Sequence, residues 1–187
     1  IEKYQYLCGS ICISEEIKDG LLNKDMSDIE KNQAINEIQS LIRTKIIYPA
    51  QAKNITVYDT DGNIFYDLGY DGFYQNDVDM LLDRLRQENQ DVWAYVHTYR
   101  DRDILVLGRR IYEQYSESRV IGYTLISIDE KIFSKTVLEP VGLADSSNIM
   151  YMNMDGTVLS SWDRNIALGK KVDSEFLKNI QQKLPSS

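Results

Sequence analysis

The sequence predicts an α+β protein with a helical N-terminal segment, a five-stranded antiparallel sheet and a smaller second module. Three observations predict this organisation. Apolar residues recur at helical spacing before residue 48, strand-like and helix-like segments alternate after it, and residues 54–65 (NITVYDTDGNIF) recur as residues 148–159 (NIMYMNMDGTVL). We expect the boundaries to give residues 1–48, 49–140 and 141–187, the last module being partial.

The first segment is predicted to be one long helix with a break near its middle. Its apolar residues lie three or four positions apart, which places them on one helix face. They are Tyr4, Leu7, Cys8, Ile11, Ile17, Leu21 and Leu22, and then Ile35, Ile38, Leu41 and Ile42. Residues 23–28 predict the break, with Ser27 or Asp28 as a new N-cap, and Pro49 ends the segment. Such a helix needs a long surface to lie against.

The second segment contains the strands of the predicted sheet. We expect strands at 55–59, 64–68, 92–99, 104–112 and 120–129, and helices at 77–88 and 131–138. Short polar connections between the last three strands favour consecutive antiparallel hairpins. The resulting order, strand–strand–helix–strand–strand–strand, is PAS-like: one antiparallel sheet with a helix and loops on one face.

The repeated segment contains an Asp-Gly pair each time, at Asp61-Gly62 and at Asp155-Gly156. Asp-Gly between two apolar runs predicts a two-residue hairpin with a type I′ turn, which needs positive φ at both central residues. A helix is predicted at 173–184 after the second hairpin. Because two strands are rarely stable alone, the second module is either truncated or rests on the N-terminal helix and the first module.

Composition and charge exclude several classes of function. The chain has 21 basic and 29 acidic residues and a net charge of −8, so nucleic-acid binding is not expected. No phosphate-binding loop, zinc signature or nucleophile elbow is present, and we expect no cofactor and no metal. His97 is the one histidine; it could serve as a pH switch or a base, but a structural or ligand-lining role is favoured. Enzymatic activity of this fragment is therefore not expected.

Several of these features together resemble a known family. They are the helix before the Asp-Gly hairpin, Trp93 at the start of the third strand, the Gly122–Phe133 run GYTLISIDEKIF, and the 148–169 segment. In these features the chain resembles an extracellular Cache (double-Cache) sensor domain, and most closely those of Gram-positive sensor histidine kinases. The resemblance implies a ligand-sensing ectodomain on the extracellular face of the cell membrane, with a membrane-anchored parent protein that forms a homodimer.

One departure from the family bears on the ligand. Amino-acid-binding members of this family carry an arginine two residues before the pocket tryptophan and an aspartate near the end of the last strand. Here these positions hold Asp91 and Ser127, and Asp129 lies two residues too far along. The resemblance therefore implies a ligand other than a free amino acid in that pocket.

Aromatic residues mark the candidate ligand site. Strand alternation places Trp93, Tyr95 and His97 on one face, and we expect the matching face of the neighbouring strands to join them. The candidate ligand-binding residues are Trp93, Tyr95, His97, Arg110, Tyr112, Tyr123, Ser127, Tyr66, Tyr70 and Tyr74. Rings, hydroxyl groups and one cation suit a small polar molecule such as a sugar. Alternatively, these aromatic residues form the core beneath the helix.

Two hypotheses of function remain open. In the first, a small molecule binds between the loop at 66–74 and the sheet and signals to a cytoplasmic kinase. In the second, the domain has no small-molecule ligand and dimerises, or binds a partner protein such as a solute-binding protein. An occupied concave pocket would favour the first hypothesis, and a flat apolar patch the second.

Overall fold

The computed structural model describes residues 1–23, 26–44, 52–69, 72–113, 119–138 and 149–181. The helices are α1 (Glu2–Ile13), α2 (Glu15–Leu22), α3 (Asp28–Thr44), α4 (Gln75–Gln87), α5 (Glu130–Val137) and α6 (Ser174–Gln181). The strands are β1 (Ala52–Asp59), β2 (Ile64–Asp67), β3 (Val92–His97), β4 (Asp103–Tyr112), β5 (Val120–Asp129), β6 (Met150–Met152) and β7 (Val158–Ser161). The predicted segment boundaries at 48/49 and 140/141, and the predicted end at Pro49, lie outside the described residues.

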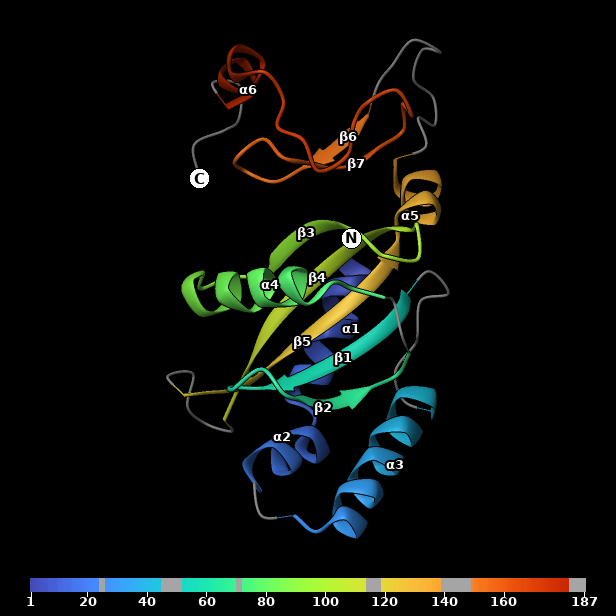
Figure 1. Cartoon of the computed structure of the whole chain (residues 1–187), viewed down its shortest axis with the longest axis vertical. Helices are drawn as coiled ribbons and strands as arrows, with labels where there is room; N and C mark the ends of the chain where they lie inside the picture. The colour runs from blue at the N-terminus through green and yellow to red at the C-terminus, as the bar shows by residue number, and fades with distance from the viewer. Residues whose placement is uncertain (24–25, 45–51, 70–71, 114–118, 139–148, 182–187) are drawn as a thin grey trace.

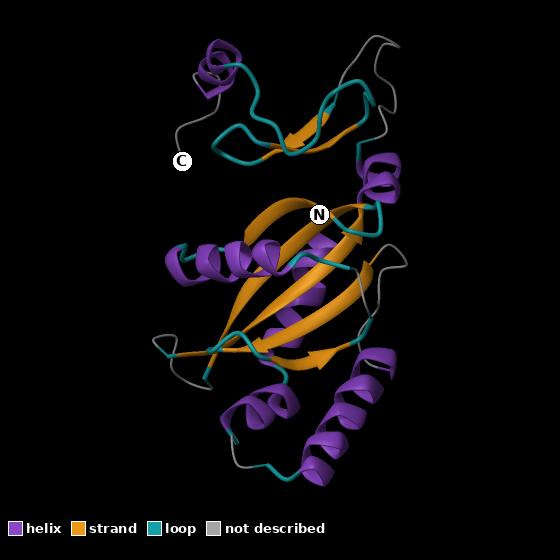
Figure 2. Ribbon diagram, in the orientation of Figure 1, coloured by secondary structure: helices purple, strands orange, loops and turns teal. Residues whose placement is uncertain are grey.

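The first five strands form one antiparallel sheet with the order β2-β1-β5-β4-β3. This arrangement confirms the predicted fold class. Helix α1 crosses one face of the sheet and α4 crosses the other (Figure 1). Helices α2 and α3 lie beyond one end of the sheet, and the β6–β7 hairpin and α6 lie beyond the opposite end (Figure 2).

The N-terminal segment is three helices rather than one long helix with a single break. Ser14 separates α1 from α2, because its backbone is extended and its Oγ accepts a hydrogen bond from the Ile17 backbone N–H. This is ordinary N-cap geometry. Helix α3 begins after Ser27 with a capping box, in which the Ser27 N–H donates to Glu30 Oε2 (2.9 Å) and the Glu30 N–H donates to Ser27 Oγ (3.4 Å). The predicted cap at Ser27 is thus confirmed.

The strand register gives the sheet two different faces. Trp93 pairs with Leu107, which in turn pairs with Ile126, and these residues face α1. The neighbouring residue Ala94 pairs with Val106, on the face that α4 covers. The core beneath α1 contains Tyr4, Leu7, Ile11, Ile55, Val57, Tyr66, Leu105, Leu107, Ile111, Ile126, Ile128 and Phe133. Helix α1 therefore lies against a long apolar surface, as its single stripe predicts.

The two Asp-Gly hairpins have the same geometry, which differs from the predicted type I′ turn. Within each of these two turns only the glycine has a positive φ, +90° at Gly62 and +83° at Gly156. Among the described non-glycine residues of the chain, only Asp101 has a positive φ. The Gly62 N–H donates to the Asp59 carbonyl, and the Asp59 N–H donates to the Asn63 carbonyl; the same two bonds recur 94 residues later. Each hairpin is therefore a type I turn closed by a glycine bulge.

The second hairpin rests on β3 and α5. Leu159 of β7 is buried in the core beneath α1, and the Tyr151 ring lies edge-on to Trp93 with centroids 5.5 Å apart. Tyr151 also contacts Phe133 of α5, with ring centroids 5.8 Å apart. Of the two arrangements left open by the sequence, the described residues show a hairpin that buries its apolar face against β3 and α5.

Candidate ligand-binding site

A cavity of about 340 Å³ lies on the face of the sheet that α4 leaves partly uncovered. It is bounded by β1 and β2, by the loop that follows β2, and by the first turn of α4. Its lining residues are Asn54, Thr56, Tyr58, Gly62, Ile64, Asp67, Gly69, Gly72, Phe73, Gln75 and Val78. We call it the sheet-face cavity.

Three polar side chains form its inner wall. Asn54 and Thr56 alternate along β1, so they share one face of the strand, and Asp67 of β2 pairs with Thr56. Asn54 Nδ2 donates to Thr56 Oγ1 (3.0 Å) and to Asp67 Oδ1 (2.9 Å), and Thr56 Oγ1 donates to the same carboxylate oxygen (3.1 Å). Each side chain is therefore held in place before any ligand arrives.

The carbonyl oxygen of the Asn54 side chain is the exceptional atom of this wall. Asn54 is 4% exposed, and its Oδ1 has no hydrogen-bond partner among the described residues. Buried acceptors without a partner are rare because they lose hydration without compensation. This oxygen is thus an unsatisfied acceptor on a side chain that lines the cavity.

The glycines of the loop keep space beside this acceptor. A Cβ at Gly69 would lie 3.1 Å from Asn54 Oδ1, so any other residue would crowd the acceptor. Gly72 has a φ of +76°, and its carbonyl accepts a hydrogen bond from the Tyr99 N–H (3.0 Å). The Tyr74 ring meets the Tyr99 ring edge-on, with centroids 5.7 Å apart. The end of the loop is therefore attached to the β3–β4 turn.

The charge of the cavity favours a ligand that donates hydrogen bonds. Asp67 is the one charged residue among those that line it, and the described lining contains no lysine, arginine or histidine. An acceptor-rich wall of this kind would repel an anion, whereas hydroxyl or ammonium groups would complement it.

Four of the predicted site residues lie on the opposite face of the sheet. Trp93, Tyr95 and His97 pair with Leu107, Leu105 and Asp103, on the face toward α1. Tyr66 pairs with Val57 and is buried in the same core. The prediction that these residues share a face with Tyr123 and Ser127 is wrong, because Tyr123 pairs with Arg110 and lies beneath α4.

Trp93 and Tyr95 instead line a groove of about 720 Å³ between α4, the edge strand β3 and the β6–β7 hairpin. The Tyr95 hydroxyl donates to Asp103 Oδ1 (2.6 Å), and His97 Nδ1 lies 3.0 Å from the same oxygen. Burial and this hydrogen bond raise the pKa of Tyr95. The tyrosine is thus a neutral donor to a carboxylate at physiological pH.

Arg110 and Tyr112 hold the end of α4 and do not line the sheet-face cavity. Arg110 donates to the Leu85 carbonyl, to the Arg86 carbonyl (2.9 Å) and to Asn89 Oδ1 (3.1 Å). The Tyr112 hydroxyl donates to Asn89 Oδ1 (3.3 Å). The Arg110 bonds to Leu85 and Arg86 satisfy carbonyl groups that a helix C-terminus leaves unpaired, while Tyr112 and Arg110 share the Asn89 side chain just beyond the helix.

The remaining predicted residues are placed as follows. Tyr123 is buried beneath α4, with the Arg86 guanidinium 5.8 Å from its ring centroid. Ser127 is buried opposite Asn54 on the cavity face without lining the cavity. Tyr74 is exposed beside Tyr99, and Tyr70 lies outside the described residues.

Asp91, two residues before Trp93, has a structural role. Asp91 forms a two-point ion pair with Arg109 of β4, in which Arg109 Nε donates to Asp91 Oδ1 (2.6 Å). The Asp91 interaction raises the pKa of the Arg109 guanidinium. This carboxylate is therefore occupied within the protein.

Asn54, Thr56 and Asp67 were not among the predicted site residues, although β1 carries a signal for them. Its sequence alternates polar Asn54, Thr56 and Tyr58 with apolar Ile55 and Val57. In a strand with neighbours on both sides, a polar face must find partners or a ligand.

His97 provides a test of the geometry at the end of β3. Its hydrogen bond to Asp103 raises the pKa of His97 above the ordinary value of 6.5. Any stability from this contact is present below pH 6.5 and is lost as the pH rises through the raised pKa. We expect NMR titration of the single histidine ring to give a pKa above 6.5 that falls toward 6.5 in Asp103→Asn. A pKa at or below 6.5 in the unaltered chain would contradict the contact.

No family model matches this sequence, and no curated protein matches it. Solved structures do resemble its fold. The periplasmic domain of Vibrio cholerae LuxQ has a TM-score of 0.53 and 15% identity, over 87% of this chain and 72% of that chain. The ligand-binding domain of the Campylobacter jejuni chemoreceptor Tlp3 with L-valine has a TM-score of 0.54 and 10% identity, over 97% and 69%.

The extracellular domain of the putative histidine kinase vpHK1S-Z8 also resembles this chain, with a TM-score of 0.53 and 15% identity over 87% of this chain and 64% of that chain. This chain thus shares its α+β fold with the periplasmic domain of LuxQ, the Tlp3 ligand-binding domain and the extracellular domain of vpHK1S-Z8. In the part of this chain that the structure describes, no helix combines the length and apolar character needed to cross a membrane.

Proposed function

We propose that this chain is the extracellular ligand-sensing domain of a Gram-positive transmembrane sensor histidine kinase. Its ligand is a small, hydroxyl-rich polar molecule such as a sugar, bound in the sheet-face cavity. The observation that carries this proposal is the buried Asn54 Oδ1, which has no partner among the described residues and lies beside the Asp67 carboxylate.

The size and lining of the cavity support this class of ligand. A volume of about 340 Å³ lies at the lower end of the range that small-molecule sites occupy. Tyr58 and Phe73 supply rings in the lining, while Asn54 and Asp67 supply acceptors. A sugar combines an apolar ring face with hydroxyl donors, so it complements both kinds of group. The three complexes of Tlp3 with small ligands support small-molecule sensing on this fold.

Signalling in this proposal follows from a shift between two arrangements of Gly69, Gly72 and Phe73, the described loop residues that line the cavity. A ligand that contacts both β1 and Phe73 binds best when the loop is closed, and this difference in affinity shifts the population. The loop is attached through Gly72 and Tyr74 to the β3–β4 turn, and β3 contacts the second hairpin through Trp93 and Tyr151. Closure would thus bias the second module and, through it, the parent kinase.

A thermal-shift screen tests the proposal. The purified chain is mixed with glucose, galactose, ribose, glycerol, putrescine and succinate, since a ligand of the native state raises the unfolding midpoint by mass action. We expect a shift from at least one sugar and none from succinate. Asn54→Leu removes the free acceptor at nearly constant volume and should weaken sugar binding about tenfold or more, as the loss of a buried hydrogen bond implies.

Asn32→Leu is the matched control, because Asn32 is exposed on α3; it should leave the sugar response unchanged. An equal thermal shift in Asn54→Leu and in the unaltered chain would show that the sugar does not bind in this cavity. A response to putrescine alone would contradict the hydroxyl-rich ligand.

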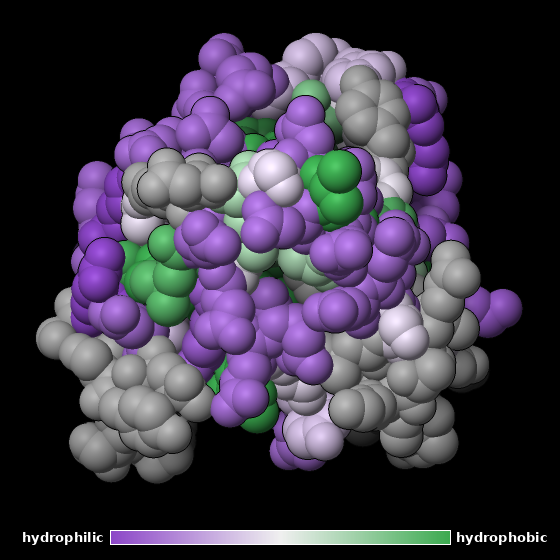
Figure 3. All heavy atoms as spheres, turned by 90° about the horizontal axis from the view of Figure 1, so that it is seen from below, coloured by the Kyte–Doolittle hydropathy of each residue, from purple (hydrophilic) through white to green (hydrophobic). Residues whose placement is uncertain are grey.

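No shift across the screen would instead favour the dimerising or partner-binding ectodomain. One observation supports that alternative: Tyr6 and Ile13, seven residues apart on α1, are 71% and 72% exposed. At the end of the molecule that carries α2 and α3, however, the visible apolar residues form separate patches within a mostly hydrophilic surface (Figure 3). Sedimentation velocity of the unaltered chain measures dimerisation directly.

A further inference from the structure

A second, smaller cavity lies where the two modules meet. It has a volume of about 220 Å³, and its polar lining comes from both modules: Tyr95, Asp103 and Lys131 from the first, and Ser161, Asp163 and Arg164 from the second. We call it the junction cavity. It shares only Tyr95 with the groove at Trp93, and shares no residue with the sheet-face cavity.

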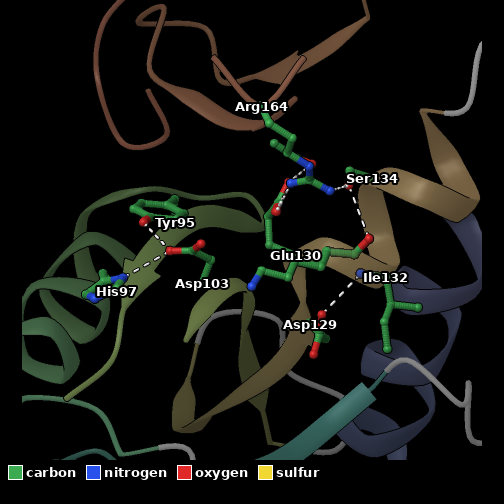
Figure 4. Close-up of polar contacts among 10 residues, drawn as sticks. Tyr95, His97, Asp103, Asp129, Glu130, Ile132, Ser134 and Arg164 are labelled. Atoms are coloured by element: carbon green, nitrogen blue, oxygen red, sulfur yellow. Dashed lines mark hydrogen bonds and ion pairs between the residues drawn. The ribbon is translucent and has the colours of Figure 1, made fainter. Parts of the chain in front are cut away.

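An ion pair between half-exposed Arg164 and buried Glu130 holds one wall of the junction cavity in place. Arg164 Nη1 lies 2.7 Å from Glu130 Oε2, and the Ser160 hydroxyl donates to the other oxygen of that carboxylate (2.6 Å). Arg164 also donates to the Ser134 hydroxyl on α5. Figure 4 shows Arg164 reaching from the second module to α5, with Asp103 projecting from the sheet nearby. The cavity wall is thus built before any ligand binds.

Ser161 is the most deeply buried residue of the lining. It is 1% exposed, and its hydroxyl has no hydrogen-bond partner among the described residues. A buried hydroxyl without a partner destabilises a protein unless a water or a ligand satisfies it. The hydroxyl is an independent indication that something polar occupies this cavity.

Within the described part of the chain, the lining contains both carboxylate oxygens that accept no hydrogen bond and a cation that forms no direct ion pair. Asp103 accepts from Tyr95 and His97 through Oδ1, and Asp163 accepts from Asn165 through Oδ1. Among the described residues no hydrogen bond reaches Oδ2 of either carboxylate. Lys131 forms no direct ion pair among them, although its charge helps to lower the pKa of Asp103. A ligand of one sign would leave the opposite charges of the cavity unsatisfied.

We propose that the junction cavity binds a small zwitterion. Its carboxylate would lie toward Lys131 and Arg164, and its ammonium group toward Asp103 and Asp163, with the Ser161 hydroxyl completing the hydrogen bonds. Such a ligand contacts both modules at once, so its binding stabilises their present arrangement. This site is separate from the sugar site proposed above.

Titration calorimetry and thermal shift on the full chain test this inference with glycine, β-alanine and γ-aminobutyrate, in which the charges are successively farther apart. Acetate and methylammonium, at equal concentration, carry one charge each. We expect at least one zwitterion to bind and to raise the midpoint, and neither single-charge probe to do so. Binding of none of the zwitterions, or equal binding of acetate, overturns the proposal.

Two variants separate a ligand role from a structural role. Lys131→Gln alters an exposed side chain and should weaken zwitterion binding at least tenfold without changing the ligand-free midpoint. Ser161→Ala should raise the ligand-free midpoint, because an unpaired hydroxyl is removed, and should also weaken zwitterion binding. Asn54→Leu should leave that binding unchanged. Unchanged affinity in Lys131→Gln and Ser161→Ala, or a loss confined to Asn54→Leu, would refute the junction site, whatever the outcome of the sugar screen.

Discussion

Replacing Phe133 by alanine is expected to lower the free energy of unfolding by about 4 kcal/mol, the range for deleting a fully buried ring. Phe133 is fully buried, and its ring contacts those of Tyr4, Trp93 and Tyr151 at centroid distances of 6.1, 6.4 and 5.8 Å. These partners belong to α1, the sheet and the second hairpin. A single cavity at Phe133 therefore weakens three parts of the molecule together.

Urea unfolding followed by tryptophan fluorescence and circular dichroism measures this effect. Because the hairpin shares the core, both signals should report one transition in the unaltered chain. The matched control is Phe176→Ala on α6, where the ring is 45% exposed, and its effect should stay below about 1 kcal/mol. A loss below about 1 kcal/mol in Phe133→Ala would mean that the second hairpin does not share this core.

Removing Arg164 is expected to have the second-largest effect. Glu130 is fully buried, so in Arg164→Ala its carboxylate keeps the Ser160 hydroxyl but loses its cation. Breaking a buried ion pair from one side costs about 3–5 kcal/mol. The Arg164 side chain is 52% exposed, so solvent screening reduces the expected loss to about 2 kcal/mol.

A double-mutant cycle separates the ion pair from the packing. Glu130→Gln removes the charge that needs compensation, so Arg164→Ala should cost much less in that background. Arg119→Ala is the matched surface control, because the Arg119–Glu113 pair is exposed, and its cost should be below about 0.5 kcal/mol. Equal costs for Arg164→Ala with and without Glu130→Gln would show that the charge interaction is not what stabilises this contact.

The order of the elements could be predicted because each long strand has its own alternation and its own polar connection. The same patterns do not predict which faces of neighbouring strands lie on the same side of the sheet. Alternation shows that Trp93 and Tyr95 share a face, but only the register shows that Leu107, rather than Arg110, is opposite Trp93. A shift of one residue moves every side chain to the other face. The predicted aromatic face was therefore assembled from two different sides of the sheet.

The type of the hairpin turn at Asp61-Gly62 also could not be predicted from the sequence. Asp61-Gly62 does mark a hairpin, but the backbone uses one more residue than the predicted type I′ turn. The Asp59 carboxylate stabilises this alternative by accepting hydrogen bonds from the N–H groups of Asp61 and Asn63 (2.9 and 2.8 Å). Asn153, the counterpart of Asp59, accepts likewise from the Thr157 N–H (2.9 Å). The repeat thus preserves the side-chain acceptor as well as the Asp-Gly pair.

The polar wall of the sheet-face cavity depends on a long-range pairing that a single sequence conceals. Asn54 and Asp67 are 13 residues apart and meet only because β2 folds back on β1. The exposed position of Asp67 on an edge strand is typical of many carboxylates without function. Asp67 becomes a candidate site residue because it lies beside the buried Asn54. Only the strand register reveals this contact.

NMR mapping tests whether the ligand binds over β1. The sugar with the largest thermal shift is added to the ¹⁵N-labelled chain, and changes in backbone amide signals are followed to saturation. We expect the largest changes at Asn54, Thr56, Asp67 and Gly69. Changes centred on Trp93, Tyr95 and Tyr151 instead would place the ligand in the groove on the other side of the sheet and would contradict binding over β1.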